Sequence, residues 1–234
     1  MHITEFRQPG IRDYARMAST RGLLFAYRYF TECHQWDIRY QTQTALRVEP
    51  NSLGLPSELT KSAVVHTPSW TNVLRDQRES LLSGLSSEQF PHRLIDLGSG
   101  TGKVLLFWRA DQDFTPGPIQ LLGLELSPSL LAIAKRNWHI MFPENEHPFR
   151  RNDFLTLPFG GSPSNQTAYL YNPLHCTRFR DLATRLVTKV SRIIYTNPVC
   201  LEAFTSTGWE VVAQRKGKFA AESWVILSRS RSQR

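Results

Sequence analysis

Short apolar runs alternate with helical patterns from about residue 91 to the end of the chain. The runs that read as buried strands are residues 93–98, 120–126, 167–173 and 192–198. The segments between them that read as helices are residues 102–110, 127–141 and 179–190. Parallel strands need a crossover connection, which is usually a helix. The alternation therefore favours a mostly parallel sheet with helices on both faces.

The remaining segments complete a seven-stranded sheet. We expect a short third strand at residues 149–154 and a short helix at residues 199–207, ended by Gly208. Residues 209–215 and 223–229 read as an antiparallel hairpin. The expected fold class is α/β: a doubly wound, mostly parallel seven-stranded sheet with an antiparallel C-terminal hairpin, preceded by an N-terminal helical extension.

The first part of the chain has a different pattern from the rest. Residues 20–40 and 69–85 place apolar and aromatic side chains at helical spacing, and a loop with proline and serine lies between them at residues 49–62. The sequence predicts a helical extension over residues 1–90 and a sheet domain over residues 91–234.

Two helix starts carry recognisable caps. Ser127 precedes Pro128, so we expect serine as the N-cap and proline at the first helical position. Ser69 is expected to cap the helix that follows it.

Length and cysteine content limit the class of protein. A chain of 234 residues with 41% hydrophobic residues can bury a core without a metal or disulfide. It has no apolar run of about 18 residues, so no membrane helix is expected. Cys33, Cys176 and Cys200 are odd in number and far apart, which predicts neither a disulfide framework nor a zinc site. A reducing compartment, most simply the cytoplasm, follows from that interpretation.

The chain is basic, with a formal net charge of +8. A positive surface speeds encounters with acidic partners, nucleic acid included. The arginines are scattered rather than clustered, so a solvated surface without a partner is the competing interpretation.

A glycine-rich turn follows the first strand of the alternating region. Asp96 is followed by Gly98, Ser99, Gly100 and Gly102, which gives the spacing G-x-G-x-G. Ligands of open α/β sheets bind at the carboxyl ends of the strands, and glycines let them approach the backbone. Dinucleotide enzymes carry G-x-G-x-x-G instead, where a helix N-terminus meets a pyrophosphate. The carboxylate of Asp96 suits a positively charged ligand better, such as S-adenosylmethionine.

A phosphate-binding P-loop is also excluded at this turn. The gap of four residues between its glycines is missing, and Val104 stands where Ser or Thr would hold magnesium. No metal ligand set is expected.

Two further acidic residues follow later strands. Glu125, beside Leu126, ends the second strand 23 residues after Gly102, so its carboxylate can accept both ribose hydroxyls of a nucleoside. Asp153 and Phe154 follow the third strand and can bind an adenine by its amine and its ring face. An ordinary surface position for Glu125 and a simple Asn-Asp turn at Asp153 are the alternatives.

The string Tyr171-Asn172-Pro173, followed by His175, ends the fourth strand beside the first. Polar side chains there would surround the transferred methyl group. Tyr195 and Asn197 end the next strand in a similar string, and proline after a strand can be simple punctuation.

These residues together resemble the class I (seven-strand, Rossmann-like) S-adenosylmethionine-dependent methyltransferases. The resemblance covers about residues 91–230 and implies that the glycine turn holds the methionine part, Glu125 the ribose and Asp153 the adenine. It also implies that Tyr171-Asn172-Pro173 forms the methyl-transfer site. The family carries its last strand antiparallel, inserted between two others.

The resemblance is closest to uncharacterised bacterial-type members, which share the stretches at residues 36–42 and 67–69. The glycine turn is also similar to that of seven-strand histone-lysine methyltransferases. Enzymes that methylate base or amide nitrogens often have a second Pro and an aromatic residue where this chain has Leu174 and His175. A base-amine acceptor is therefore disfavoured.

The expected activity is direct transfer of a methyl group to an unidentified acceptor, which could be a protein side chain such as lysine, an RNA or a small molecule. Residues 1–90 are expected to cover the carboxyl edge of the sheet and shape the acceptor pocket. His66 and His175 are candidate bases for an oxygen acceptor. The alternative is a non-catalytic cofactor-binding module that uses its basic surface to hold nucleic acid or protein. The oligomeric state stays open.

Overall fold

A computed structural model of the chain describes residues 7–60, 64–156, 162–173 and 176–229. Its centre is a seven-stranded sheet in the order β3-β2-β1-β4-β5-β7-β6. The strands are β1 (His92–Leu97), β2 (Ile119–Glu125), β3 (Phe149–Arg151), β4 (Gln166–Tyr171), β5 (Arg192–Thr196), β6 (Trp209–Arg215) and β7 (Trp224–Arg229). The first five strands pair in parallel, and β7 runs antiparallel between β5 and β6. The predicted fold class is confirmed, including the inserted antiparallel last strand.

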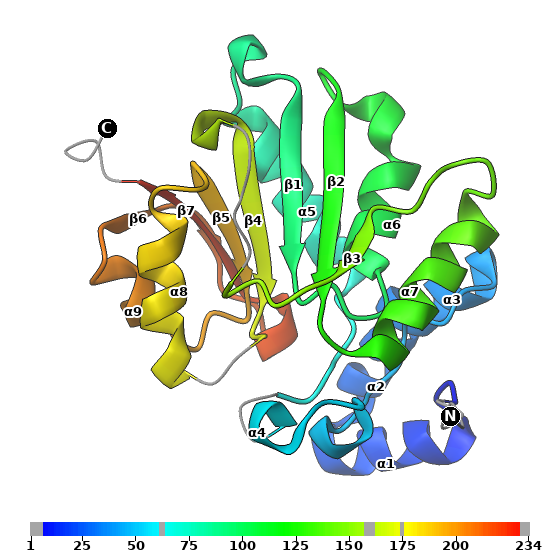
Figure 1. Cartoon of the computed structure of the whole chain (residues 1–234). Helices are drawn as coiled ribbons and strands as arrows, with labels where there is room; N and C mark the ends of the chain where they lie inside the picture. The colour runs from blue at the N-terminus through cyan, green and yellow to red at the C-terminus, as the bar shows by residue number, and fades with distance from the viewer. Residues whose placement is uncertain (1–6, 61–63, 157–161, 174–175, 230–234) are drawn as a thin grey trace.

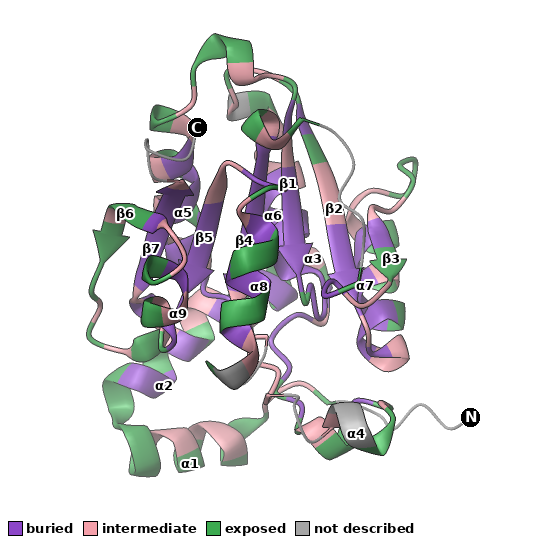
Figure 2. Ribbon diagram, turned by 60° about the vertical axis from the view of Figure 1, so that its left-hand side comes forward, coloured by how far each residue is buried: buried purple, intermediate pink, exposed green. Residues whose placement is uncertain are grey.

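Helices cover both faces of the sheet, because alternate side chains of each buried strand point to opposite faces. On one face lie α5 (Thr71–Ser83), α6 (Lys103–Ala110) and α7 (Pro128–Met141), and on the other lie α8 (Phe179–Leu186) and α9 (Leu201–Thr205). In β1, for example, Leu94 joins the first core and Ile95 the second. In Figure 2, where purple marks buried residues, β1, β4, β5 and β7 are mostly purple, whereas β3 and β6 at the two edges of the sheet are largely exposed.

The N-terminal part is a chain of short helices beside the carboxyl edge of the sheet (Figure 1). They are α1 (Ile11–Arg21), α2 (Leu23–Tyr29), a π-helical turn η1 (Phe30–His34), α3 (Gln35–Tyr40) and α4 (Ser57–Thr60). The single helix expected over residues 20–40 is interrupted at Gly22, whose φ of +91° lies outside the helical region. Short 3₁₀ turns lie at Pro50–Ser52, Ser87–Gln89, Gln112–Phe114, Pro163–Asn165, Cys176–Arg178 and Ala220–Glu222.

The N-terminal helices share a hydrophobic core with the sheet. Phe25, Tyr29 and Trp36 belong to the same buried cluster as Leu105 and Trp108 of α6. The extension is therefore packed onto the sheet rather than tethered to it.

The two predicted caps have different outcomes. Ser127 caps α7 as expected, with its Oγ accepting from the Leu130 amide at 3.3 Å. The predicted cap at Ser69 is wrong, because Trp70 is the N-cap of α5 and Ser69 is buried. The Ser69 hydroxyl instead lies 3.2 Å from the Tyr169 hydroxyl on β4, a partner 100 residues away.

The prediction that no cysteines pair is also wrong. Cys176 and Cys200 form a disulfide, with their Cα atoms 5.4 Å apart. They are distant in sequence but follow β4 and β5, which are adjacent in the sheet. Cys33 is free and buried. The inference of a reducing compartment thereby loses its premise.

Among the described helices, none combines the length and apolar character needed to cross a membrane. Within the same residues, no group of three or more His, Cys, Asp or Glu side chains could hold a metal ion.

Candidate functional site

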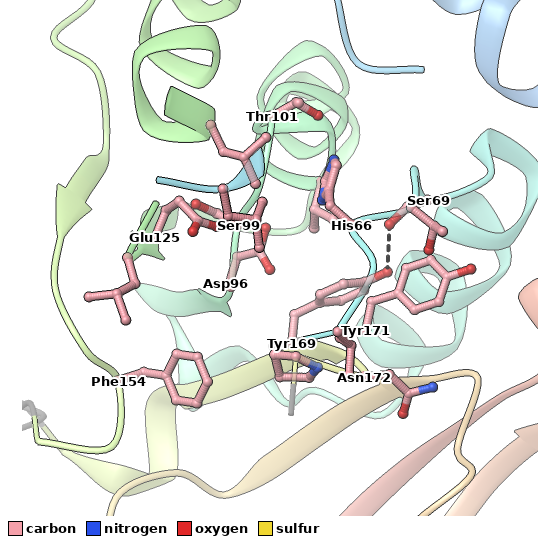
Figure 3. Close-up of a pocket in the computed structure, with 18 of the residues that line it drawn as sticks. His66, Ser69, Asp96, Ser99, Thr101, Glu125, Phe154, Tyr169, Tyr171 and Asn172 are labelled. Carbon is pink, nitrogen blue, oxygen red and sulfur yellow. Dashed lines mark hydrogen bonds between the residues drawn. The ribbon is translucent and has the colours of Figure 1, made fainter. Parts of the chain in front are cut away.

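A pocket lies at the carboxyl ends of β1, β2 and β4 (Figure 3). It brings together most of the site residues predicted from the sequence: Asp96, Gly98, Ser99, Glu125, Leu126, Asp153, Phe154, Tyr171, Asn172 and Pro173. This position is where open α/β sheets bind their ligands, because the strand order reverses there.

The glycine turn connects β1 to α6. Gly98 and Gly100 have φ values of +85° and +54°, a region that side chains disfavour. A Cβ on Gly100 would also clash with the ring of His66. Gly102 caps α6 and a Cβ there would meet Phe149 at 2.7 Å. Gly100 and Gly102 therefore shape the turn but do not line the pocket.

Asp96 and Ser99 present unpaired polar atoms to the pocket. Asp96 is 2% exposed and Ser99 6%, and neither Asp96 Oδ2 nor Ser99 Oγ has a hydrogen-bond partner among the described residues. Burial, together with the nearby Glu125 charge, raises the pKa of Asp96 well above its usual range. A buried polar group without a partner is unfavourable, so both atoms are suited to bind a ligand. A cationic ligand would also relieve the unfavourable burial of an ionised Asp96.

Glu125 joins the second strand to the glycine turn. Its Oε2 accepts from the Gly100 amide at 2.7 Å and its Oε1 from the Ser127 amide at 2.8 Å. Burial raises the pKa of Glu125, and these backbone bonds oppose that rise. Each carboxylate oxygen keeps a second lone pair, so the side chain can still accept from a diol.

Asp153 and Phe154 line the side of the pocket beyond β3. Asp153 Oδ1 accepts from the Leu155 amide at 2.9 Å, which forms the local turn that was the alternative interpretation. Phe154 faces the same pocket and is nearly buried. One carboxylate oxygen of Asp153 thus supports the turn, while the residue also lines the pocket.

Tyr171, Asn172 and Pro173 form the opposite wall. Asn172 has a φ of +43°, and its Oδ1 accepts from the Tyr195 hydroxyl at 2.7 Å. The Tyr195 hydroxyl also accepts from the Cys200 amide at 3.2 Å, so Tyr195 supports the pocket without lining it. Burial raises the pKa of Tyr171 to about 12, which keeps it protonated at neutral pH. Leu174 and the predicted His175 lie outside the described residues.

The N-terminal part supplies a wall that sequence reasoning did not assign to the cofactor pocket. Val64–Ser69 line it, and the His66 ring lies over Gly100 (Figure 3). Backbone bonds to Val48 hold His66 in place, and its Nε2 has no described partner. Burial lowers the pKa of His66 to about 4, so the ring is neutral near pH 7.

A buried lysine holds this part against the glycine turn, and a buried aspartate holds the loop that follows α3. Lys103 Nζ donates to the Glu32 carbonyl at 2.6 Å, in the π-helical turn, and lies 5.8 Å from the Trp36 ring centroid. Asp37 accepts from the amides of Thr44 and Ala45, at 2.8 and 2.7 Å. Sequence patterns do not reveal these contacts. The Lys103–Glu32 contact joins residues distant along the chain, and the contacts of Asp37 cross an irregular loop.

No family model matches the chain, and no curated protein matches it. Solved structures do. The chain is similar to a ribosomal protein L11 methylase from Lactobacillus delbrueckii subsp. bulgaricus, with 15% identity, a TM-score of 0.50, and coverage of 68% of this chain and 78% of that one. It is also similar to magnesium protoporphyrin IX methyltransferase from Synechocystis PCC 6803 with bound SAM, with 14% identity, a TM-score of 0.50, and coverage of 88% and 96%.

A third similar structure is SAM-bound CalS10, an amino pentose methyltransferase from Micromonospora echinaspora, with 15% identity, a TM-score of 0.50, and coverage of 69% of this chain and 92% of that one. At this level of identity the likeness concerns the fold. The fold is that of class I, Rossmann-like methyltransferases.

Proposed function

We propose that the protein is an S-adenosylmethionine-dependent methyltransferase. The observation that carries the proposal is the pair of buried, unpartnered atoms, Asp96 Oδ2 and Ser99 Oγ, beside the glycine turn. Three carboxylates line the pocket, those of Asp96, Glu125 and Asp153, against two cations, Arg178 and the buried Lys103, whose amine is directed to the Glu32 carbonyl. This charge balance favours a cationic nucleoside over a pyrophosphate.

The residues present fit the cofactor from end to end. Asp96 and Ser99 bind the amino-acid part, Glu125 accepts from the ribose hydroxyls, and Asp153 with Phe154 binds the adenine. When bound, S-adenosylmethionine supplies a methyl group on a positively charged sulfur, already activated for transfer.

The chain's own contribution is alignment and exclusion of water. Tyr171, Asn172 and Pro173 orient the acceptor atom at the end of β4, with Tyr195 holding Asn172 in position. Well-aligned reactants gain roughly 7–11 kcal/mol from proximity alone. An acceptor hydroxyl or amine loses one proton for each methyl group it gains, and the neutral His66 ring is a candidate to accept that proton.

Residues 1–90 complete the site in this proposal. Val64–Ser69 close the cofactor pocket, while α1 and α2 bound the space beyond it. The acceptor in this proposal is a protein side chain, an RNA or a small molecule.

A cytoplasmic location remains part of the proposal. It now rests on the cofactor alone, because the cysteine argument no longer supports it. Cell fractionation tests it, and recovery of the protein outside the cytoplasmic fraction would contradict it.

Calorimetry with S-adenosylmethionine tests the cofactor assignment. Asp96→Ala and Glu125→Gln are each expected to weaken binding about tenfold to a hundredfold, because a charged hydrogen bond is lost. Asp181→Ala, at an exposed carboxylate of α8, is the matched control and should bind normally. Thermal unfolding of each variant shows whether it is folded.

Transfer is tested with methyl-labelled S-adenosylmethionine and fractionated lysate. A labelled acceptor that disappears with Asp96→Ala supports the enzyme. Cofactor binding without any labelled acceptor favours the alternative, a non-catalytic module that holds nucleic acid or protein through its basic surface. Binding of NAD in place of S-adenosylmethionine would reject the cofactor assignment.

A further inference from the structure

A second, larger cavity adjoins the cofactor pocket. Its volume is about 1190 Å³, and it lies between α1, α2 and the ends of β4 and β5. Thr67, Pro68 and Tyr171 line both cavities. The two spaces therefore meet at Tyr171, next to the place where the methyl group is transferred.

One side of this cavity is aromatic. Phe25 lies 5.7 Å from Trp70 and 5.1 Å from Phe219, measured between ring centroids, and Trp70 lies 6.0 Å from Phe219. Tyr29 and Tyr171 extend this side toward the cofactor pocket. The three rings come from α2, from the start of α5 and from the β6–β7 connection, so only the folded chain assembles them. A flat apolar ligand can pack against such a surface.

The other side is basic. The lining holds four arginines and two carboxylates: Arg7, Arg16, Arg21, Arg47, Asp13 and Glu49. Arg7 pairs with Asp13 at 2.6 Å, and Arg47 with Glu49 at 3.3 Å. Among the residues that the structure describes, Arg16 and Arg21 form no ion pair. Arg21 is thus available to a ligand, and so is Arg16, whose charge acts on Asp13 without forming an ion pair with it.

Arg21 connects the two sides. Its guanidinium carbon lies 4.9 Å from the Phe25 ring centroid. The same charge acts on Tyr171, where it opposes the rise in pKa caused by burial. Arg21 therefore lies over Phe25 on the aromatic side and is close enough to interact electrostatically with Tyr171, where the two cavities meet. A guanidinium is well suited to a carboxylate because it can donate two parallel hydrogen bonds.

We propose that this cavity is the acceptor site and that it takes a planar aromatic small molecule bearing an anionic group such as a carboxylate. Its role as acceptor site rests on the proposed methyltransferase function, but the binding does not. The cavity is larger than the roughly 300–1,000 Å³ typical of small-molecule sites, so a bicyclic acid fits. The aromatic side binds the ring, Arg21 and Arg16 bind the anion, and the nucleophilic atom faces Tyr171.

Three naphthalene compounds of equal ring size test the site: 2-naphthoate, the neutral 2-naphthamide and the cationic 2-naphthylmethylammonium. In calorimetry with the full chain, 2-naphthoate is expected to bind about tenfold more tightly than the amide, and the ammonium compound more weakly still. Arg21→Gln should remove most of the preference for the anion and leave amide binding unchanged. Arg180→Gln, an exposed arginine on α8, is the control and should change nothing.

A second variant checks the aromatic side. Phe219→Ala, at a half-buried position, should weaken the binding of 2-naphthoate and 2-naphthamide by the same factor. Equal binding of all three compounds would overturn the proposal, and so would an equal effect of Arg21→Gln and Arg180→Gln. Competition between 2-naphthoate and S-adenosylhomocysteine would also overturn it, because the acid would then occupy the cofactor pocket.

The same titrations separate this proposal from the proposed function. S-adenosylmethionine is titrated alone, so its failure to bind rejects the methyltransferase whatever 2-naphthoate does. Normal cofactor binding without selective binding of 2-naphthoate rejects only the acceptor class.

Discussion

At the scale of single residues, the available hydrogen-bond partners separate buried side chains of the same type. Asp96 has an oxygen without a partner and a raised pKa, whereas Asp37 is just as buried but satisfied by backbone amides. The sequence predicted Asp96 and Glu125, because an acidic residue before a glycine turn and another at a strand end are local patterns. It assigned Ser69 to the wrong role, because the Tyr169 hydroxyl lies far away along the chain.

The raised pKa of Asp96 predicts that cofactor binding is coupled to loss of the proton from the Asp96 carboxyl group. The folded chain holds this proton more tightly than the unfolded chain, so stability falls as pH rises from about 4, the ordinary aspartate value, toward the raised pKa. A cationic ligand favours the ionised carboxyl, so binding should release up to about one proton and tighten with pH in that window.

Calorimetry in two buffers of different ionisation enthalpy measures the released proton. Asp96→Asn should abolish the release and reduce the fall of stability with rising pH, while Glu125, whose pKa is also raised, keeps part of that dependence. Equal proton release from the variant and the unchanged chain would contradict the assignment.

At the scale of elements, the connections after β4 and β5 act as one unit. Tyr195 bonds to Asn172 and to the Cys200 amide, and the disulfide joins Cys176 to Cys200. The sequence predicted both strands and their shared Asn-Pro ends, because apolar runs ended by Asn-Pro are local signals. The contacts between the two strand ends depend on β4 lying beside β5, which follows from the order of strands in the sheet.

The disulfide predicts a distinct pattern of thiol reactivity. Alkylation of the denatured chain without reductant should modify one cysteine, Cys33, and alkylation after reduction should modify all three. Closing a loop across a sequence separation of 24 stabilises the fold by about 3 kcal/mol, so reduction should lower the thermal midpoint. Intact-mass spectrometry measures the count, and three modified cysteines without reductant would show that the bond is absent.

At the scale of the whole molecule, the N-terminal helices and the sheet form one structure. Phe25, Tyr29, Trp36 and Trp70 pack in the same cluster as the side chains of α6 and one face of the sheet. The sequence predicted helices in this part from their periodicity and placed them over the carboxyl edge of the sheet, yet it did not predict that they pack against α6. The buried Lys103 is held by the Glu32 carbonyl, so the glycine turn itself depends on the N-terminal part.

A chain that begins at residue 91 should therefore not fold stably. Without the N-terminal part, the apolar face formed by α6 and its neighbours, including Leu105 and Trp108, would be exposed to solvent. Thermal unfolding followed by near-ultraviolet circular dichroism should show no cooperative transition, and cofactor binding should be lost. A cooperative transition with normal cofactor affinity would mean that the sheet domain is independent.

The sequence by itself determined the strands, the antiparallel hairpin that the last two of them form, and the residues proposed to hold the cofactor, whereas the insertion of the last strand was implied by the resemblance to the family. These features are predictable because hydrophobic periodicity and turn residues are patterns of residues close together in the sequence. Only the tertiary structure decided which cysteines pair, that the His66 ring lies over Gly100, and that Arg21 faces an aromatic side beside Tyr171. Those contacts join segments distant along the chain, and their geometry follows from how the helices pack on the sheet rather than from any local pattern.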